Sequence, residues 1–110
     1  MMEPTPSDLS QAPNWQNYVV AQAVAASLGQ LSVNTLGYGV KTEEASVTLR
    51  FQMRQVDEQD RENISDIASE LEALLGAKIT VVTEIFQGTE FHIAPARPDE
   101  RWIYLAQIST

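Results

Sequence analysis

The sequence contains no cysteine, which excludes thiol nucleophiles, cysteine-bound zinc and disulfide bonds. It is also poor in basic residues: seven Lys and Arg stand against fifteen Asp and Glu among 110 residues, and the formal net charge is −8. Binding to a phosphate backbone or to an anionic membrane needs clustered basic side chains. We therefore expect neither nucleic acid nor a membrane as a partner.

Long hydrophobic runs are absent as well. The most apolar stretch, YVVAQAVAASL at residues 18–28, is interrupted by Gln22 and is shorter than the ~20 residues of a membrane-spanning helix. The first ten residues hold Glu3 and Asp8 and no basic residue, unlike a signal peptide. Together with the missing cysteine, these features predict a cytoplasmic protein.

Motifs that carry chemistry are missing too. His92 is the only histidine, and its place in the segment FHIA predicts a surface or cross-strand position. The sequence has no GxSxG nucleophile motif, no glycine-rich phosphate-binding motif and no cluster of His, Asp and Glu at metal-ligand spacing. We expect no enzyme, no cofactor and no metal site.

The length and a hydrophobic content of 44% are typical of one globular domain. Residues 1–13 hold three prolines and predict a flexible N-terminal arm, followed by a single domain over residues 14–110. Asn14 is expected to cap a first helix and Gly29 to follow its C-terminal end. Apolar side chains cover most of the circumference of this helix, so we expect it to be largely buried.

Five strands are expected. Strict alternation of apolar and polar side chains over residues 45–55 predicts a strand with one face in the core and one in solvent. Gly37 and Gly39 predict a β-bulge in the strand before it. Apolar residues on both faces of the last strand predict a central place in the sheet, with coverage by a partner as the alternative. The other expected strands span residues 31–40, 78–86, 91–94 and 102–108.

A second helix is expected between Asp57, its N-cap, and Gly76, its stop signal, because Ile and Leu between them follow the spacing of a core-facing stripe. The element order is then αββ-αββ-β. This order predicts the α+β class: a mainly antiparallel sheet with two helices packed on one face.

The second helix is strongly acidic. Positions 57–72 hold seven of the fifteen acidic residues, and Arg61 is the only basic residue among them. Capping and the helix dipole account for the acids of the first turn. Glu62, Asp66 and Glu70 recur at every fourth position, where like charges cost about 0.2–0.5 kcal/mol per pair. Two interpretations remain: a solvated helix face, or a surface that steers a basic protein toward it.

In its single domain, its lack of cysteine, its α+β pattern and its acidic run DEQDRENISDIASELE, the sequence resembles the immunity proteins of bacterial contact-dependent growth inhibition and polymorphic-toxin systems. The resemblance implies a small inhibitor that binds a cognate basic toxin, such as a nuclease acting on RNA, and covers its active-site cleft. The residues expected to bind the partner are the acids of the second helix and two aromatic anchors: Asp57, Glu58, Asp60, Glu62, Asp66, Glu70, Glu72, Trp102 and Tyr104.

The alternative is an acidic chaperone of a secreted effector, similar to those of type III secretion systems. Such chaperones are also small, acidic and α+β, and they usually form dimers. This sequence departs from their pattern because its last predicted element is a strand and not a helix.

Overall fold

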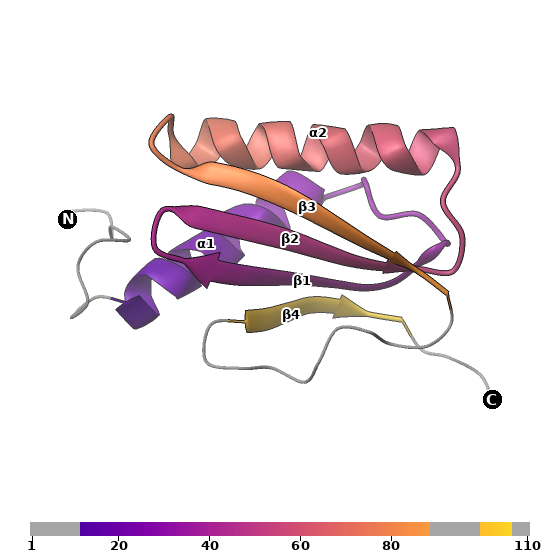
Figure 1. Ribbon diagram of the computed structural model, residues 1–110, viewed down its shortest axis with the longest axis horizontal. Helices are drawn as coiled ribbons and strands as arrows, with labels where there is room; N and C mark the ends of the chain where they lie inside the picture. Colours follow the sequence, from indigo (N-terminus) through magenta and orange to yellow (C-terminus); the bar gives the residue numbers. More distant parts are fainter. Residues whose placement is uncertain (1–11, 89–99, 107–110) are drawn as a thin grey trace.

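Two helices cover one face of a four-stranded sheet (Figure 1). This computed structural model describes residues 12–88 and 100–106 of the chain. The expected α+β class and the packing of both helices on one face are confirmed. The expected strand at residues 91–94, with His92, and most of the N-terminal arm lie outside the described residues. In chain order the elements are α1 (Ala12–Ser27), β1 (Thr35–Glu43), β2 (Ser46–Met53), α2 (Glu58–Leu75), β3 (Thr80–Gln87) and β4 (Glu100–Leu105).

The strands are arranged in the order β3-β2-β1-β4, and the sheet is mixed. β1 is antiparallel to both of its neighbours, as expected, whereas β2 and β3 run parallel. The parallel pair follows from the connection between these strands. Because α2 carries the chain back along the sheet, β3 starts at the same end as β2 and runs in the same direction.

The expected central place of the last strand is wrong. In the described part of the chain, β4 pairs only with β1 and forms one edge of the sheet. Ile103 packs against the core, but Tyr104 is 38% exposed and Leu105 is 55% exposed. Apolar residues on both faces therefore did not signal a central strand here, because part of this apolar surface stays in contact with solvent.

The apolar face of β2 forms the centre of the core. Phe51 stacks on Tyr38 of β1, with the ring centroids 4.8 Å apart. The Tyr38 hydroxyl donates a hydrogen bond to the backbone carbonyl of Ala23 in α1 at 3.3 Å. Burial raises the pKa of this hydroxyl, so it stays protonated and continues to donate. Of the side chains that the alternation assigns to the core, Val47, Leu49, Phe51 and Met53 are buried, but Ala45, just before β2, is exposed. Gln52, which the alternation assigns to solvent, is buried, and its side chain donates to the carbonyl of Gly88 at 2.7 Å.

α1 begins earlier and is less buried than expected. It starts at Ala12, so Asn14 lies inside the helix and is not its N-cap. One face is buried, but Val24 on the opposite side is 40% exposed, because this helix forms an outer layer and nothing among the described residues packs above it. Gly29 follows the helix end with a φ of 76°, as expected.

The bulge that the glycines predict in β1 is confirmed next to Gly37, whereas the irregularity next to Gly39 comes from an extra residue in β4. The register with β2 shifts next to Gly37, and the register with β4 shifts next to Gly39. At Gly39 the strands come so close that a Cβ atom would lie 3.1 Å from the carbonyl oxygen of Arg101. Any larger residue at this position would require the backbone of β4 to move by a few tenths of an ångström, so glycine favours this close pairing.

The substitution Phe51→Ala is expected to lower the free energy of unfolding by about 3–5 kcal/mol, because it opens a cavity beneath the helices and removes the stack on Tyr38. Urea unfolding followed by the fluorescence of the buried Trp15 measures this loss. The control is Val82→Ala, at a position that is 44% exposed, where a loss below about 1 kcal/mol is expected. Equal losses in the two variants would contradict the central place of Phe51 in the core.

Candidate functional site

α2 begins with a complete capping box, which confirms the sequence prediction for Asp57. The backbone N–H of Asp60 donates to Asp57 Oδ1 at 2.8 Å, and the backbone N–H of Asp57 donates to Asp60 Oδ2 at 3.1 Å. At the other end, the N–H of Gly76 donates to the carbonyl of Glu72 at 2.9 Å. Both predicted ends of this helix are thus confirmed.

Asp60 is part of the fold and only 3% exposed. Its Oδ2 accepts a hydrogen bond from the side chain of Asn34 at 2.8 Å, which fastens the start of α2 to the loop before β1. Burial by itself raises the pKa of the Asp60 carboxyl, but the hydrogen bonds it accepts, from Ser32, Asn34 and Asp57, outweigh burial and hold this pKa below its ordinary value. This carboxylate has its partners within the chain, so we leave it out of the candidate surface.

Four other carboxylates stand exposed on the side of α2 that faces away from the core. They are spaced by four residues, so neighbours lie about 6 Å apart along the helix axis. The ion pairs found among the described residues involve Lys41 and Arg50, and none of them reaches these four carboxylates. Their charge is therefore uncompensated in the described part of the chain. We call this set the acidic stripe: Glu58, Glu62, Asp66 and Glu70.

The acidic stripe winds around α2, because each step of four residues turns by about 40°. At its C-terminal end, Asp66 and Glu70 reach a groove between α1 and α2 of about 490 Å³. The facing wall is mostly apolar: Ala25, Ala26 and Leu28 line it, together with the polar Gln30. Leu28, in the turn after α1, is 73% exposed. The groove thus sets two carboxylates beside an exposed apolar surface.

Glu72 is exposed as well, but it lies on the other side of α2. There it lines a second groove, between α2 and β3, together with Arg61. Glu72 occupies the last turn of the helix, which holds no basic residue and where the negative end of the helix dipole disfavours a carboxylate. Helix stability therefore gives no reason for an acid at this position.

The two expected aromatic anchors are not part of the α2 surface. Trp102 and Tyr104 lie on β4, at the edge of the sheet farthest from β3, whereas α2 packs beside β3 (Figure 1). The register pairs Trp102 with Gly39 and Tyr104 with Tyr38. Because Tyr38 and Gly39 are consecutive, their partners Tyr104 and Trp102 lie on opposite faces of the sheet, with a bulge in β4 between them. The alternation had predicted both aromatic rings on one face.

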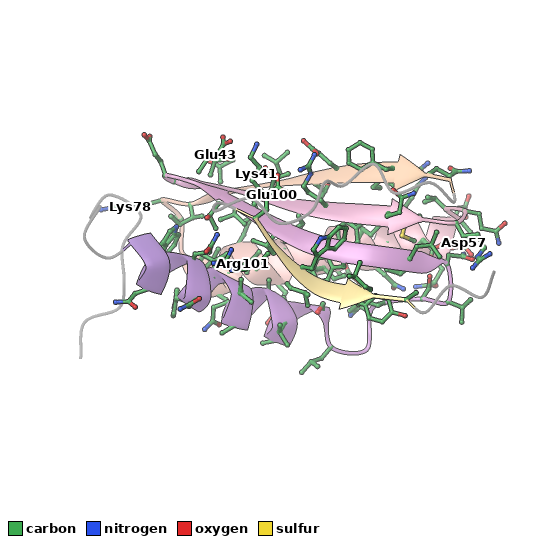
Figure 2. All side chains as sticks on the ribbon, turned by 90° about the horizontal axis from the view of Figure 1, so that it is seen from below. Lys41, Glu43, Asp57, Lys78, Glu100 and Arg101 are labelled. Carbon is green, nitrogen blue, oxygen red and sulfur yellow. The ribbon has the colours of Figure 1, made fainter. Side chains whose placement is uncertain are left out.

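An ion-pair network on the open face of the sheet, the face turned away from the helices, escaped the sequence analysis. Arg50 Nε donates to Glu84 Oε2 at 3.0 Å, and Arg50 Nη1 donates to Glu100 Oε1 at 2.9 Å. Gly39 lies between Arg50 and β4, and its missing side chain lets the guanidinium reach across β1. Figure 2 shows Glu100 on this face with Lys41 and Glu43. The partners are 34 and 50 residues apart in sequence, so no local pattern connects them.

This network ties β4 to the rest of the sheet. Glu100 is 5% exposed, and its Oε2 is buried without a hydrogen-bond partner among the described residues. The cavity beside Glu100 and Trp102 measures only about 10 Å³, which is no more than the space of one water molecule. No small-molecule substrate fits there. The network therefore serves the fold, because a buried carboxylate needs its cation nearby.

The substitution Asp60→Asn is expected to lower the free energy of unfolding at neutral pH by roughly 1–3 kcal/mol, because charge-assisted hydrogen bonds are lost in a buried place. Since the pKa of Asp60 is lowered on folding, its stabilisation is present above the unfolded pKa of about 3.9 and is lost as the pH falls below that value. In the variant, the free energy of unfolding should therefore fall less steeply at acid pH than in the unsubstituted protein.

Urea unfolding at a series of pH values between about 7 and 3 tests both statements. Glu70→Gln, which removes one exposed charge of the same sign, is the matched control and should unfold at neutral pH like the unsubstituted protein. An Asp60→Asn variant with unchanged stability and unchanged pH dependence would mean that the hydrogen bonds of Asp60 do not stabilise the fold.

Within residues 12–88 and 100–106, no group of three or more His, Asp or Glu side chains is placed to hold a metal ion. Neither of the two described helices has the length and hydropathy needed to cross a bilayer. A comparison of the sequence with protein-family models finds no match, and a comparison with curated proteins finds none either. Among the described residues, the acidic stripe and its adjoining groove are thus the surface that best fits a binding role.

Proposed function

We propose that this protein is a small inhibitor that binds a basic partner protein through the acidic stripe of α2 and the groove between α1 and α2. The partner is a secreted toxin with a phosphate-binding cleft, of which a nuclease is the clearest example. The proposal agrees with the resemblance of the sequence to immunity proteins. The observation that carries it is a line of exposed, uncompensated carboxylates that leads into a groove with an apolar wall.

The helix dipole accounts for Glu58 in the first turn, but the charge of the rest of the stripe is a feature that folding alone would not select. Like charges four residues apart destabilise a helix by a few tenths of a kcal/mol, and Glu58, Glu62, Asp66 and Glu70 repeat this spacing three times. A stripe of one sign raises the rate at which an oppositely charged protein associates, by roughly 10–1,000-fold at low salt. A fast inhibitor of a toxin gains from this property.

The groove between α1 and α2 supplies apolar surface for tight binding, which charge alone does not provide. Rim charges act mainly on association, whereas slow dissociation requires apolar side chains that are buried on binding. Leu28 and Ala25 offer such a surface next to Asp66 and Glu70. The occupant that fits is a segment with an apolar side chain flanked by Lys or Arg, as found beside a phosphate-binding cleft.

The double substitution Asp66→Lys/Glu70→Lys is expected to slow association with the partner by about tenfold or more at low salt, and by less at high salt, where charges are screened. The helix itself should persist, since the reversal makes the spacing from position 62 to 66 attractive and leaves the spacing from 66 to 70 like-charged, as it already is. The matched control is Glu43→Lys/Glu44→Lys, which changes the net charge equally at an exposed hairpin away from α2.

The partner is first captured from a lysate of the native host with the immobilised chain, identified by mass spectrometry and purified. Association rates are then measured at low and high salt, and the nuclease activity of the partner is titrated with each protein. The proposal expects inhibition at one-to-one stoichiometry by the unsubstituted chain and by the control. Association of the double variant at the control's rate, or a partner that stays fully active when bound, would refute it.

A further inference from the structure

The outer edge of β3 pairs with no other strand among the described residues, and α2 lies alongside it on the helix-covered side (Figure 1). In the described part of the chain, β3 pairs only with β2, and its eight residues, TVVTEIFQ, contain no proline and a single charged residue, Glu84. The register with β2 runs without a bulge from Thr80 to Gln87. The Glu84 carboxylate is held by Arg50 over the open face. Monomeric proteins usually guard such edges with lysine, proline, bulges or short strands.

A groove runs beside this edge on the helix-covered side of the sheet. α2 and β3 line it, and its volume is about 280 Å³. Ile64, Val81 and Ile85 form its apolar part, and the wall formed by α2 carries the short side chains of Ser65 and Ala68. A strand that pairs with the edge of β3 would therefore place its own helix or side chains over this groove. The short side chains of α2 allow that helix to come close.

We infer that this face binds a second copy of the chain, with the two β3 strands paired antiparallel about a two-fold axis at Thr83. In this register Thr83 meets Thr83 of the partner subunit, and Val81 meets Ile85 of the partner subunit. On the open face, Val82 lies opposite Glu84 of the partner subunit. No two like charges are opposed along the strand, and the two sheets join into one.

The charges at the two ends of the groove between α2 and β3 are opposite in sign, so this groove is complementary to the same groove of a second copy. Arg61 and Glu72 are eleven residues apart, which places them about 16 Å apart along α2. Because the chain turns from α2 directly into β3, the helix runs opposite to the strand, so Arg61 lies at the end of the groove near Ile85 and Glu72 at the end near Val81. A two-fold axis through the middle sets Arg61 against Glu72 of the partner subunit, and the same contact recurs at the other end.

This pairing also gives a role to Glu72, whose position in the last turn of α2 works against helix stability. The stripe members Glu62, Asp66 and Glu70 point away from β3 and stay exposed in the dimer. The dimer interface and the proposed toxin-binding surface can therefore be tested by separate substitutions, and neither inference rests on the other.

Size-exclusion chromatography with multi-angle light scattering, on the full chain at low salt, tests the dimer. The unsubstituted chain is expected at twice its mass of 12.2 kDa. Arg61→Glu should raise the dissociation constant of the dimer by roughly tenfold or more, because it opposes like charges at both ends of the interface. The charge swap Arg61→Glu/Glu72→Arg should restore the dimer, whereas Glu62→Arg, on the stripe, should leave it unchanged.

A cross-link locates the axis independently. The chain has no cysteine, so Thr83→Cys introduces a single thiol at the two-fold axis, where the facing residues of an antiparallel pair are close enough for a disulfide. This variant should form a cross-linked dimer on mild oxidation, and Glu43→Cys, on the hairpin between β1 and β2, should not. A monomeric unsubstituted chain, a dimer that Arg61→Glu leaves intact, a charge swap that fails to restore it, or equal cross-linking of both cysteine variants would overturn the inference.

Discussion

The alternating apolar face of β2 is buried beneath α1 and α2, and the rest of the structure depends on this contact. Phe51 sits at its centre, stacked on Tyr38, which in turn bonds to the backbone of α1. Because side chains alternate strictly along a strand, a shift of one residue would turn this whole face to solvent. The contact therefore fixes the register of the sheet and the side of each helix that faces inward.

The orientation of α2 has a direct consequence for its charge. With Ile64, Ile67 and Leu71 held in the core, the acids at every fourth position are turned outward, and no ion pair among the described residues reaches them. The acids of α2 thus divide into two groups. Asp57 and Asp60 build the helix start and are used by the fold, whereas the exposed acids after the first turn have no such role in the fold and are the ones that we propose for binding.

The two surfaces proposed for α2 lie on different sides of the same helix. The stripe leads toward α1 and a groove with an apolar wall, and the other side meets the open edge of β3. A dimer through β3 would present two acidic stripes on one assembly. Because chaperones of secreted effectors usually form dimers, such a dimer would also agree with the chaperone alternative, and the partner of the stripe distinguishes the two interpretations.

Local patterns in the sequence were sufficient for the helix from Asp57 to Gly76, for the alternating strand β2 and for the bulge next to Gly37. These features depend on capping, side-chain periodicity and the absence of a Cβ, which act within a few residues. The sequence also placed Glu62, Asp66 and Glu70 nearly in line, because a spacing of four residues is close to one turn of the helix.

Contacts between distant segments decided the rest. Only the tertiary structure placed β4 at an edge, made β2 and β3 parallel and separated Trp102 and Tyr104 from the acidic stripe. It also joined Arg50 to Glu84 and Glu100 and buried Asp60 against Asn34. These outcomes depend on how elements far apart in the chain meet, and hydrophobic periodicity says which side of a strand or helix is buried but not which neighbour covers it.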